Sequence, residues 1–112
     1  MHALDALGDP VRRRLVEELA AGPRPAGALA RVAAEDFGIS QPATSRHLRV
    51  LREAGVVLSD VDGARRQYSL RPEAMEDITT WVEQVSAFWN QRLDALETEI
   101  ARGNAARRKG NS

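Results

Sequence analysis

The chain has 112 residues, 16 basic and 16 acidic side chains, and no cysteine. This length fits a single domain, and 43% hydrophobic with 29% charged residues is typical of a globular fold rather than a disordered or fibrous one. The missing thiols exclude disulfides, cysteine nucleophiles and zinc sites built on sulfur. The sequence contains no apolar run long enough to span a membrane, and residues 1–7 do not resemble a signal peptide. We therefore expect a cytoplasmic protein with no membrane partner.

The N-terminal segment predicts two short helices joined by a tight corner. Leu4 and Leu7 belong to the first helix, and Gly8-Asp9-Pro10 supplies a stop, an N-cap and a first-turn proline for the second. Val11, Leu15 and Leu19 form the buried stripe of the second helix. The run Arg12-Arg13-Arg14 is either a solvated helix face or a phosphate contact, and its position on an amphipathic helix favours the solvated face.

Two further helices are predicted in the middle of the chain. One runs from about Pro25 to Ala34 without a side-chain cap, and the next begins at Ser40-Gln41-Pro42 and ends at Gly55. The second of these has an inward stripe formed by Leu48, Leu51 and either Thr44 or Ala43. Its start is the sharpest local signal in the sequence, because Ser40 can cap the helix and a proline follows in the first turn.

Two strand-like segments follow, Val56 to Val61 and Arg66 to Leu70, on either side of Asp62-Gly63. Such a dipeptide suits a turn that needs a positive φ, so the sequence predicts a β-hairpin. Helices followed by a hairpin in this order predict a winged helix-turn-helix fold, mainly α, with about five helices and a two-stranded wing.

Pro72 opens a last helix that we expect to reach Arg102 and to end at Gly103, with residues 103–112 as a disordered basic tail. Residues 1–102 would then form one domain. The helix would be about 45 Å long, which exceeds the roughly 30 Å span of a compact domain of this size. Part of its apolar stripe must therefore contact another chain, and a two-fold homodimer is the simplest arrangement. The stripe residues we assign to this interface are Trp81, Val85, Phe88, Trp89, Leu93 and Leu96.

The outward face of the helix that begins after Ser40 has the composition of a DNA-reading surface. It carries hydrogen-bond donors and no acid: Gln41, Pro42, Ser45, Arg46, Arg49 and Arg52. Arg46 and Arg49 suit the O6 and N7 atoms of guanine, Gln41 suits adenine, and Ser40 or Ser45 suits a phosphate oxygen. At the hairpin tip, Arg65 and Arg66 are placed for phosphate or minor-groove contact.

Three stretches resemble the ArsR-type winged-helix repressors of bacteria. They begin Leu7-Gly8-Asp9-Pro10, Ile39-Ser40-Gln41-Pro42 and Asp62-Gly63-Ala64-Arg65, and the similarity covers about residues 3–100. The resemblance implies a homodimer joined through the first and last helices, which adds Leu4 and Leu7 to the interface. It also implies an inverted-repeat operator and repression by blocking transcription. The positions it assigns to DNA recognition are Gln41, Thr44, Ser45, Arg46 and Arg49, with wing contacts from Arg65 and Arg66.

Metal sensing is not expected, because the cysteine site of the founding members is missing here and residues 72–102 contain no histidine for the alternative site. We interpret His47 as a structural histidine within the helix-turn-helix. The sequence indicates no cofactor and assigns no small-molecule inducer.

Two other functions compete with a DNA-binding repressor. A winged-helix module could instead bind a protein partner through its aromatic last helix, with weak or absent DNA affinity. An enzyme is not expected, because the chain has no GxSxG motif, phosphate loop or paired-carboxylate cleft. Salt-sensitive binding to duplex DNA would exclude the protein-binding alternative.

Overall fold

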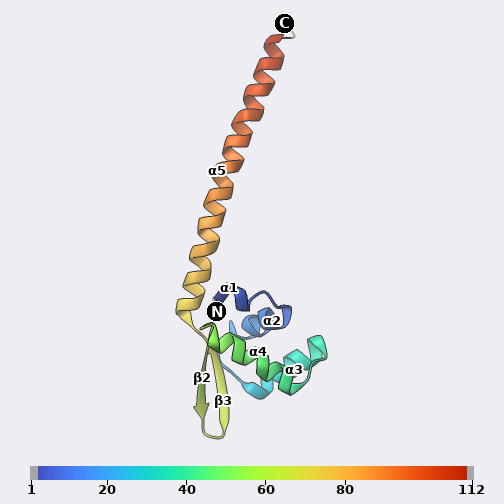
Figure 1. Ribbon diagram of the computed structural model, residues 1–112, viewed down its shortest axis with the longest axis vertical. Coiled ribbons are helices and arrows are strands. Elements are labelled where there is room, and N and C mark those ends of the chain that lie inside the picture. The colour runs from blue at the N-terminus through green and yellow to red at the C-terminus, as the bar shows by residue number, and fades with distance from the viewer. Residues whose placement is uncertain (1–2, 111–112) are drawn as a thin grey trace. The chain divides into compact units, whose positions relative to one another are not determined.

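The computed structural model describes residues 3–110, apart from the side chains of residues 62 and 106–110 (Figure 1). The chain divides into two units, one ending at Ile78 and one beginning at Thr79. The elements in chain order are α1 (Ala3–Ala6), α2 (Pro10–Leu19), β1 (Arg24–Pro25), α3 (Ala26–Phe37), α4 (Gln41–Glu53), β2 (Val57–Asp62), β3 (Arg65–Leu70) and α5 (Pro72–Gly110). Within the described residues this is a mainly helical winged helix-turn-helix fold, as the sequence predicts.

The corner between α1 and α2 forms as expected. The Asp9 carboxylate accepts hydrogen bonds from the backbone N–H groups of Val11, at 2.8 Å, and Arg12, at 3.3 Å. Partial burial opposes ionisation of this carboxyl, but the two N–H donors outweigh it, and together with the positive charge of Arg12 they lower the pKa of Asp9. Asp9 therefore stabilises the start of α2 in its charged form.

The core of the first unit joins α2, α3 and α4 with the wing. Leu15 on α2, Leu29 on α3 and Leu51 on α4 are completely buried, and Tyr68 on β3 packs against the same cluster. Truncating a leucine in such a core costs about 2–5 kcal/mol. This packing fixes which face of α4 points away from the protein.

Helix α3 is longer than the sequence indicates. The expected end near Ala34 was wrong, because α3 continues to Phe37 and ends at Gly38, whose φ of 67° is the left-handed conformation that glycine adopts readily. Helix α4 begins as predicted, with the Ser40 hydroxyl oxygen accepting a hydrogen bond from the Ala43 N–H at 3.3 Å.

The wing is part of a three-stranded antiparallel sheet with the order β1-β3-β2. The expected two-stranded wing was incomplete, because Arg24 and Pro25 pair with Tyr68 and Gln67 of β3. The hairpin itself forms as expected. Asp62 pairs with Arg65 across a two-residue turn, and Gly63 takes a φ of 63°.

Within the second unit, α5 runs without interruption from residue 79 to Gly110. The expected helix end at Gly103 was therefore wrong, and residues 103–110 are helical rather than irregular. An interior glycine costs a helix only about 1 kcal/mol relative to alanine, and the alanines, arginines and lysine that follow are good helix formers. Residues 111–112 lie outside the described part of the chain. No helix among residues 3–110 combines the length and apolar character needed to cross a membrane.

Candidate nucleic-acid interface

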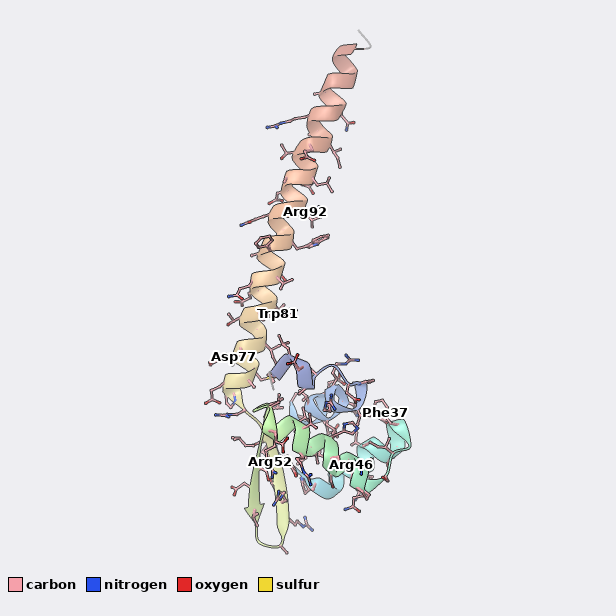
Figure 2. All side chains as sticks on the ribbon, in the orientation of Figure 1. Phe37, Arg46, Arg52, Asp77, Trp81 and Arg92 are labelled. Atoms are coloured by element: carbon pink, nitrogen blue, oxygen red, sulfur yellow. The ribbon has the colours of Figure 1, made fainter. Side chains whose placement is uncertain are left out.

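Helix α4 presents one buried and one exposed face. Leu48 and Leu51 are buried in the core, which turns the opposite face of the helix outward. The outward residues are Ser40 at the cap, then Gln41, Ser45, Arg46, Arg49 and Arg52, all exposed. Figure 2 labels two of these, Arg46 and Arg52, along α4. The exposed face therefore carries three guanidinium groups together with amide and hydroxyl groups.

The wing supplies two more arginines beside this helix. Arg65 and Arg66 are exposed at the start of β3, immediately after the hairpin turn. A groove between α4 and β3, which we call the α4 groove, is lined by Ala26, Ser45, Arg49, Arg52, Arg66 and Tyr68. Among the described residues no acid lines this groove, which brings Ser45 and Arg49 of α4 together with Arg66 of the wing. The other candidates are exposed but do not line it: Ser40, Gln41, Arg46 and Arg65.

The arginines of the first unit fall into two classes according to their partners. Five of them bond to acids, carbonyls or a histidine within the unit: Arg12, Arg13, Arg14, Arg24 and Arg71. Among the atoms that the structure describes, six others have no hydrogen-bond or ion-pair partner: Arg31, Arg46, Arg49, Arg52, Arg65 and Arg66. We call this second group the partner-free class. Each guanidinium offers five N–H donors and is always charged, so the partner-free class remains available to an anionic ligand.

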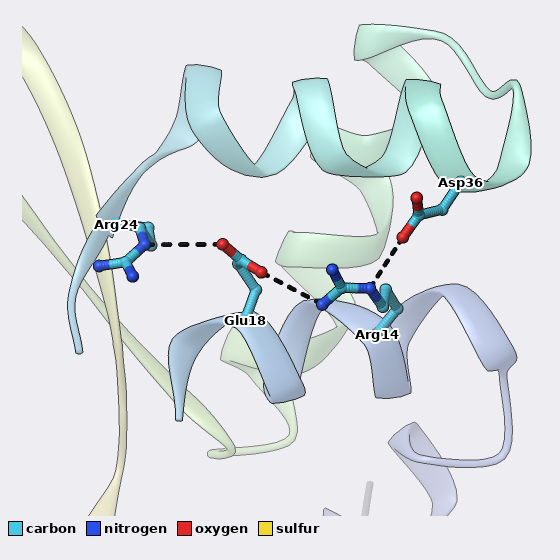
Figure 3. A network of polar contacts seen from close by, with 4 residues as sticks. All are labelled: Arg14, Glu18, Arg24 and Asp36. Carbon is cyan, nitrogen blue, oxygen red and sulfur yellow. Dashed lines mark hydrogen bonds and ion pairs between the residues drawn. The ribbon is translucent and has the colours of Figure 1, made fainter. Parts of the chain in front are cut away.

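The first class has a structural role, which is clearest in a network of four residues (Figure 3). Arg14 bonds to Asp36 at 2.8 Å and to Glu18 at 3.2 Å, and Glu18 also pairs with Arg24 at 3.7 Å. The hydrogen bonds to Asp36 and Glu18 raise the pKa of Arg14. The network links α2 to α3 and to β1, the strand that pairs with the wing.

Comparison with known proteins identifies relatives that are transcriptional regulators. Residues 7–60 match a family model described as a helix-turn-helix domain. The chain is 41% identical over 91 residues to the HTH-type transcriptional regulator Rv2034 of Mycobacterium tuberculosis, covering 81% of this chain and 78% of the relative. It is 35% identical over 77 residues to the transcriptional repressor SdpR of Bacillus subtilis, covering 69% of this chain and 81% of that protein.

Among solved structures, the chain is similar to a homodimeric winged helix-turn-helix DNA-binding domain, Mb0332 of Mycobacterium bovis, a possible ArsR-family transcriptional regulator. The TM-score is 0.59 at 25% identity, and the match covers 75% of this chain and 74% of the other. This chain belongs to the ArsR-type winged helix-turn-helix repressors. It is therefore a DNA-binding transcriptional regulator and not an enzyme.

One predicted recognition residue of this ArsR-type chain does not face a ligand. The resemblance assigned Thr44 to DNA contact, but its side chain is only 1% exposed. Its hydroxyl donates a hydrogen bond to the Ser40 carbonyl at 3.1 Å, within the first turn of α4. Assigning Thr44 to DNA contact was therefore wrong, because the position belongs to the inward stripe that the helical periodicity also indicated.

The run Arg12-Arg13-Arg14 matches the expected solvated helix face only in part. Arg13 is exposed and Arg14 forms an i,i+4 pair with Glu18, but Arg12 and Arg14 are half-buried and all three side chains bond within the unit. Arg12 donates from Nε to the Ala6 carbonyl and from Nη1 to His47 Nδ1, the latter at 3.4 Å. Because a guanidinium can only donate, the Nδ1 atom accepts this bond, and His47 links α2 to the recognition helix. Arg13 donates to the Leu7 carbonyl at 3.3 Å. The run therefore holds the first unit of the repressor together.

Two arginines of the partner-free class were not predicted as DNA contacts from the sequence, Arg31 and Arg52. Arg52 lies on the outward face predicted for α4 but was not included among the DNA contacts, although its three-residue spacing from Arg49 indicated it. Arg31 carried no local signal, because its position beside the wing depends on how α3 packs against the hairpin. Among the side chains that the structure describes, no cluster of three or more histidine or acidic groups is arranged to hold a metal ion.

Proposed function

We propose that this chain is a homodimeric repressor that binds an inverted-repeat operator through α4 and the wing. The observation that carries the proposal is the set of exposed arginines that have no partner among the described atoms, most of which line grooves between the helix-turn-helix and the wing. Guanidinium groups that are always charged and unpaired favour a polyanionic ligand, and a helix of this kind fits the major groove of DNA.

The residues of α4 divide into those that read bases and those that bind the backbone. Arg46 and Arg49 would donate to the O6 and N7 atoms of guanine, and Gln41 would pair with adenine. Ser40 and Ser45 would bind phosphate oxygens. On the wing, Arg65 and Arg66 would contact phosphates or the minor groove, which strengthens binding without reading sequence.

The second unit supports a dimer. Every residue from 79 to 105 is exposed in the single chain, including Phe88, which is 78% exposed. The other interface candidates on this helix, also exposed, are Trp81, Val85, Trp89, Leu93 and Leu96. A stripe of this size does not remain in water, so we assign it to a second copy of the chain, with half-buried Leu4 and Leu7 of the α1 segment completing the interface.

A dimer of this kind represses by steric exclusion. Two recognition helices about 34 Å apart would enter successive major grooves on one side of the duplex. Residues 1–102 would act as one DNA-binding and dimerisation domain in the cytoplasm, where they would compete with the transcription machinery. The chain has no cysteine, so release of DNA would not depend on a thiolate metal site.

The test is binding of the full chain to duplex DNA from its own promoter and to a random duplex. Both are titrated at low and high salt, once with excess zinc and once with chelator. We expect selective promoter binding that weakens steeply with salt and does not respond to zinc. Equal binding to both duplexes would overturn the operator assignment. Release by zinc would overturn the metal-independent part, and absence of salt-sensitive binding would favour the protein-binding module.

A further inference from the structure

A second groove lies between the start of α3 and the tip of the wing, and we call it the α3–wing groove. One side is formed by Pro25, Ala26, Gly27, Ala28 and Arg31, and the other by Ala64, Arg65 and Arg66. Three of its eight lining residues are arginines and none is acidic. All three arginines belong to the class without described protein partners.

The floor of this groove is built from small side chains. Gly27 and three alanines contribute almost no bulk, and a Cβ atom added at Gly27 would meet nothing within 4 Å. The arginines therefore surround an open channel that a sugar-phosphate backbone can enter closely. A site for a bulky apolar side chain would instead need aromatic or aliphatic walls.

The two grooves are neighbours. Ala26 and Arg66 line both the α3–wing groove and the α4 groove, so these two residues form the boundary between them. A strand of nucleic acid held in the α4 groove therefore has a continuous positively charged path past Arg66 toward Arg31 and Arg65.

We propose that the α3–wing groove binds a segment of the DNA backbone next to the segment contacted by α4, with Arg31 as a phosphate ligand. This inference rests on the proposed function, because the shared boundary is what makes the two grooves follow one duplex. An acidic peptide is the weaker occupant, since nothing would connect it to the α4 groove. The contact is with phosphate alone, so it strengthens binding to every sequence equally.

The experiment measures the binding constant of the full chain for promoter and random duplexes across a series of salt concentrations. Arg31→Ala removes the proposed ligand, and Arg31→Lys restores its charge. We expect Arg31→Ala to weaken both duplexes by a similar factor, about eightfold at 0.1 M salt for each phosphate released, and to reduce the salt slope by about 0.9 per phosphate. Arg31→Lys should recover most of that slope. Arg102→Ala removes the same charge from α5 and should leave the slope unchanged.

Gly27→Glu is a second variant that separates binding from folding. The added side chain meets open space, and a carboxylate in the first turn of α3 interacts favourably with the helix dipole, so the unfolding midpoint should not fall. The carboxylate also lies one helical turn before Arg31 and can pair with it. We expect Gly27→Glu to weaken binding to both duplexes at least as much as Arg31→Ala.

Each outcome decides the inference. If the unmodified chain binds the promoter selectively, and Arg31→Ala and Gly27→Glu bind DNA as tightly as the unmodified chain, the α3–wing groove is not a phosphate site. The proposed function would still stand. If Arg31→Ala weakens only promoter binding, Arg31 reads bases and the assignment to the backbone is wrong. If the unmodified chain binds no DNA, the proposed function and this inference fail together.

Discussion

The first unit uses one residue type for two purposes, and the difference lies in the partners each arginine has. Around α2 and β1, guanidinium groups bond to carboxylates and carbonyls, as in the contact of Arg14 with Asp36 at 2.8 Å. On α4 and the wing, Arg46, Arg49 and Arg66 are exposed and have no partner among the described atoms. The position of an arginine run in the sequence therefore says little about its role until its acid neighbours are placed.

Breaking the proposed dimer should have the greatest consequence, because it removes half of the partner-free arginines from each DNA complex. Trp89→Ala deletes a large aromatic side chain that is 57% exposed in the single chain. Aromatic residues at the centre of an interface contribute about 2 kcal/mol or more to association. The dissociation constant of the Trp89→Ala dimer should therefore be much higher than that of the unmodified dimer. Sedimentation equilibrium measures this, with Arg92→Ala, a polar change on the same helix, as the control. An undisturbed dimer would place Trp89 outside the interface.

Arg46→Ala tests the partner-free class on the recognition helix. We expect specific promoter binding to weaken by about 1–3 kcal/mol, because a bidentate pair of hydrogen bonds to guanine is removed. Thermal unfolding should not change, since the side chain has no described partner. Fluorescence anisotropy and calorimetry on one preparation give both values. Unchanged promoter affinity would remove Arg46 from the base-reading set.

Asp9→Ala tests the polar contacts that hold the first unit together. Loss of an aspartate N-cap typically costs about 1 kcal/mol of unfolding free energy, and the loss should appear at neutral pH. The pKa of Asp9 is lowered from 3.8 in the folded chain, so its stabilising effect is present above that value and is lost as the pH falls through the lower folded value.

The free energies of unfolding of the unmodified chain and of Asp9→Ala should therefore converge below about pH 4. Denaturant titrations between about pH 2 and 7 measure the two curves. A difference that stays constant down to the lowest pH would mean that the charged carboxylate is not what caps α2.

Arg14→Ala should have the smallest effect. Its side chain is 34% exposed, and ion pairs of this kind contribute less than about 1 kcal/mol. We expect a small fall in the unfolding midpoint and no change in the affinity or the salt slope of DNA binding, whereas Arg46→Ala should weaken promoter binding without changing thermal unfolding. A salt slope reduced as much as by a wing variant would place Arg14 on the DNA, outside the structural class.

The parts of the fold that the sequence predicts well are those fixed by local chemistry. The cap at Ser40, the corner at Asp9, the glycine turn at Gly63 and the inward stripe of α4 each depend on residues close together in the chain. The outward face of the recognition helix follows from that stripe. The periodicity left Thr44 or Ala43 as the third inward residue, and the burial of Thr44 decides between them and overturns its assignment to DNA by resemblance.

The features that sequence reasoning missed depend on tertiary contacts or on weak local preferences. Strand β1 has two residues, one of them proline, and exists because β3 lies beside it. Helix α3 continues about one turn beyond its expected end. Helix α5 continues through Gly103, because one interior glycine is too weak a helix breaker to end it. Arg31 joins the candidate site only because α3 packs against the wing tip, a proximity that no spacing in the chain encodes.

The division of the arginines into two classes is tested most directly by the salt dependence of duplex binding for three proteins measured side by side. These are the unmodified chain, Arg66→Ala from the partner-free class and Arg14→Ala from the structural class. We predict a steep slope for the unmodified chain, a slope lower by about 0.9 for each phosphate that Arg66→Ala releases, and an unchanged slope for Arg14→Ala. Equal slopes for all three proteins, or a larger change for Arg14→Ala than for Arg66→Ala, would contradict the division.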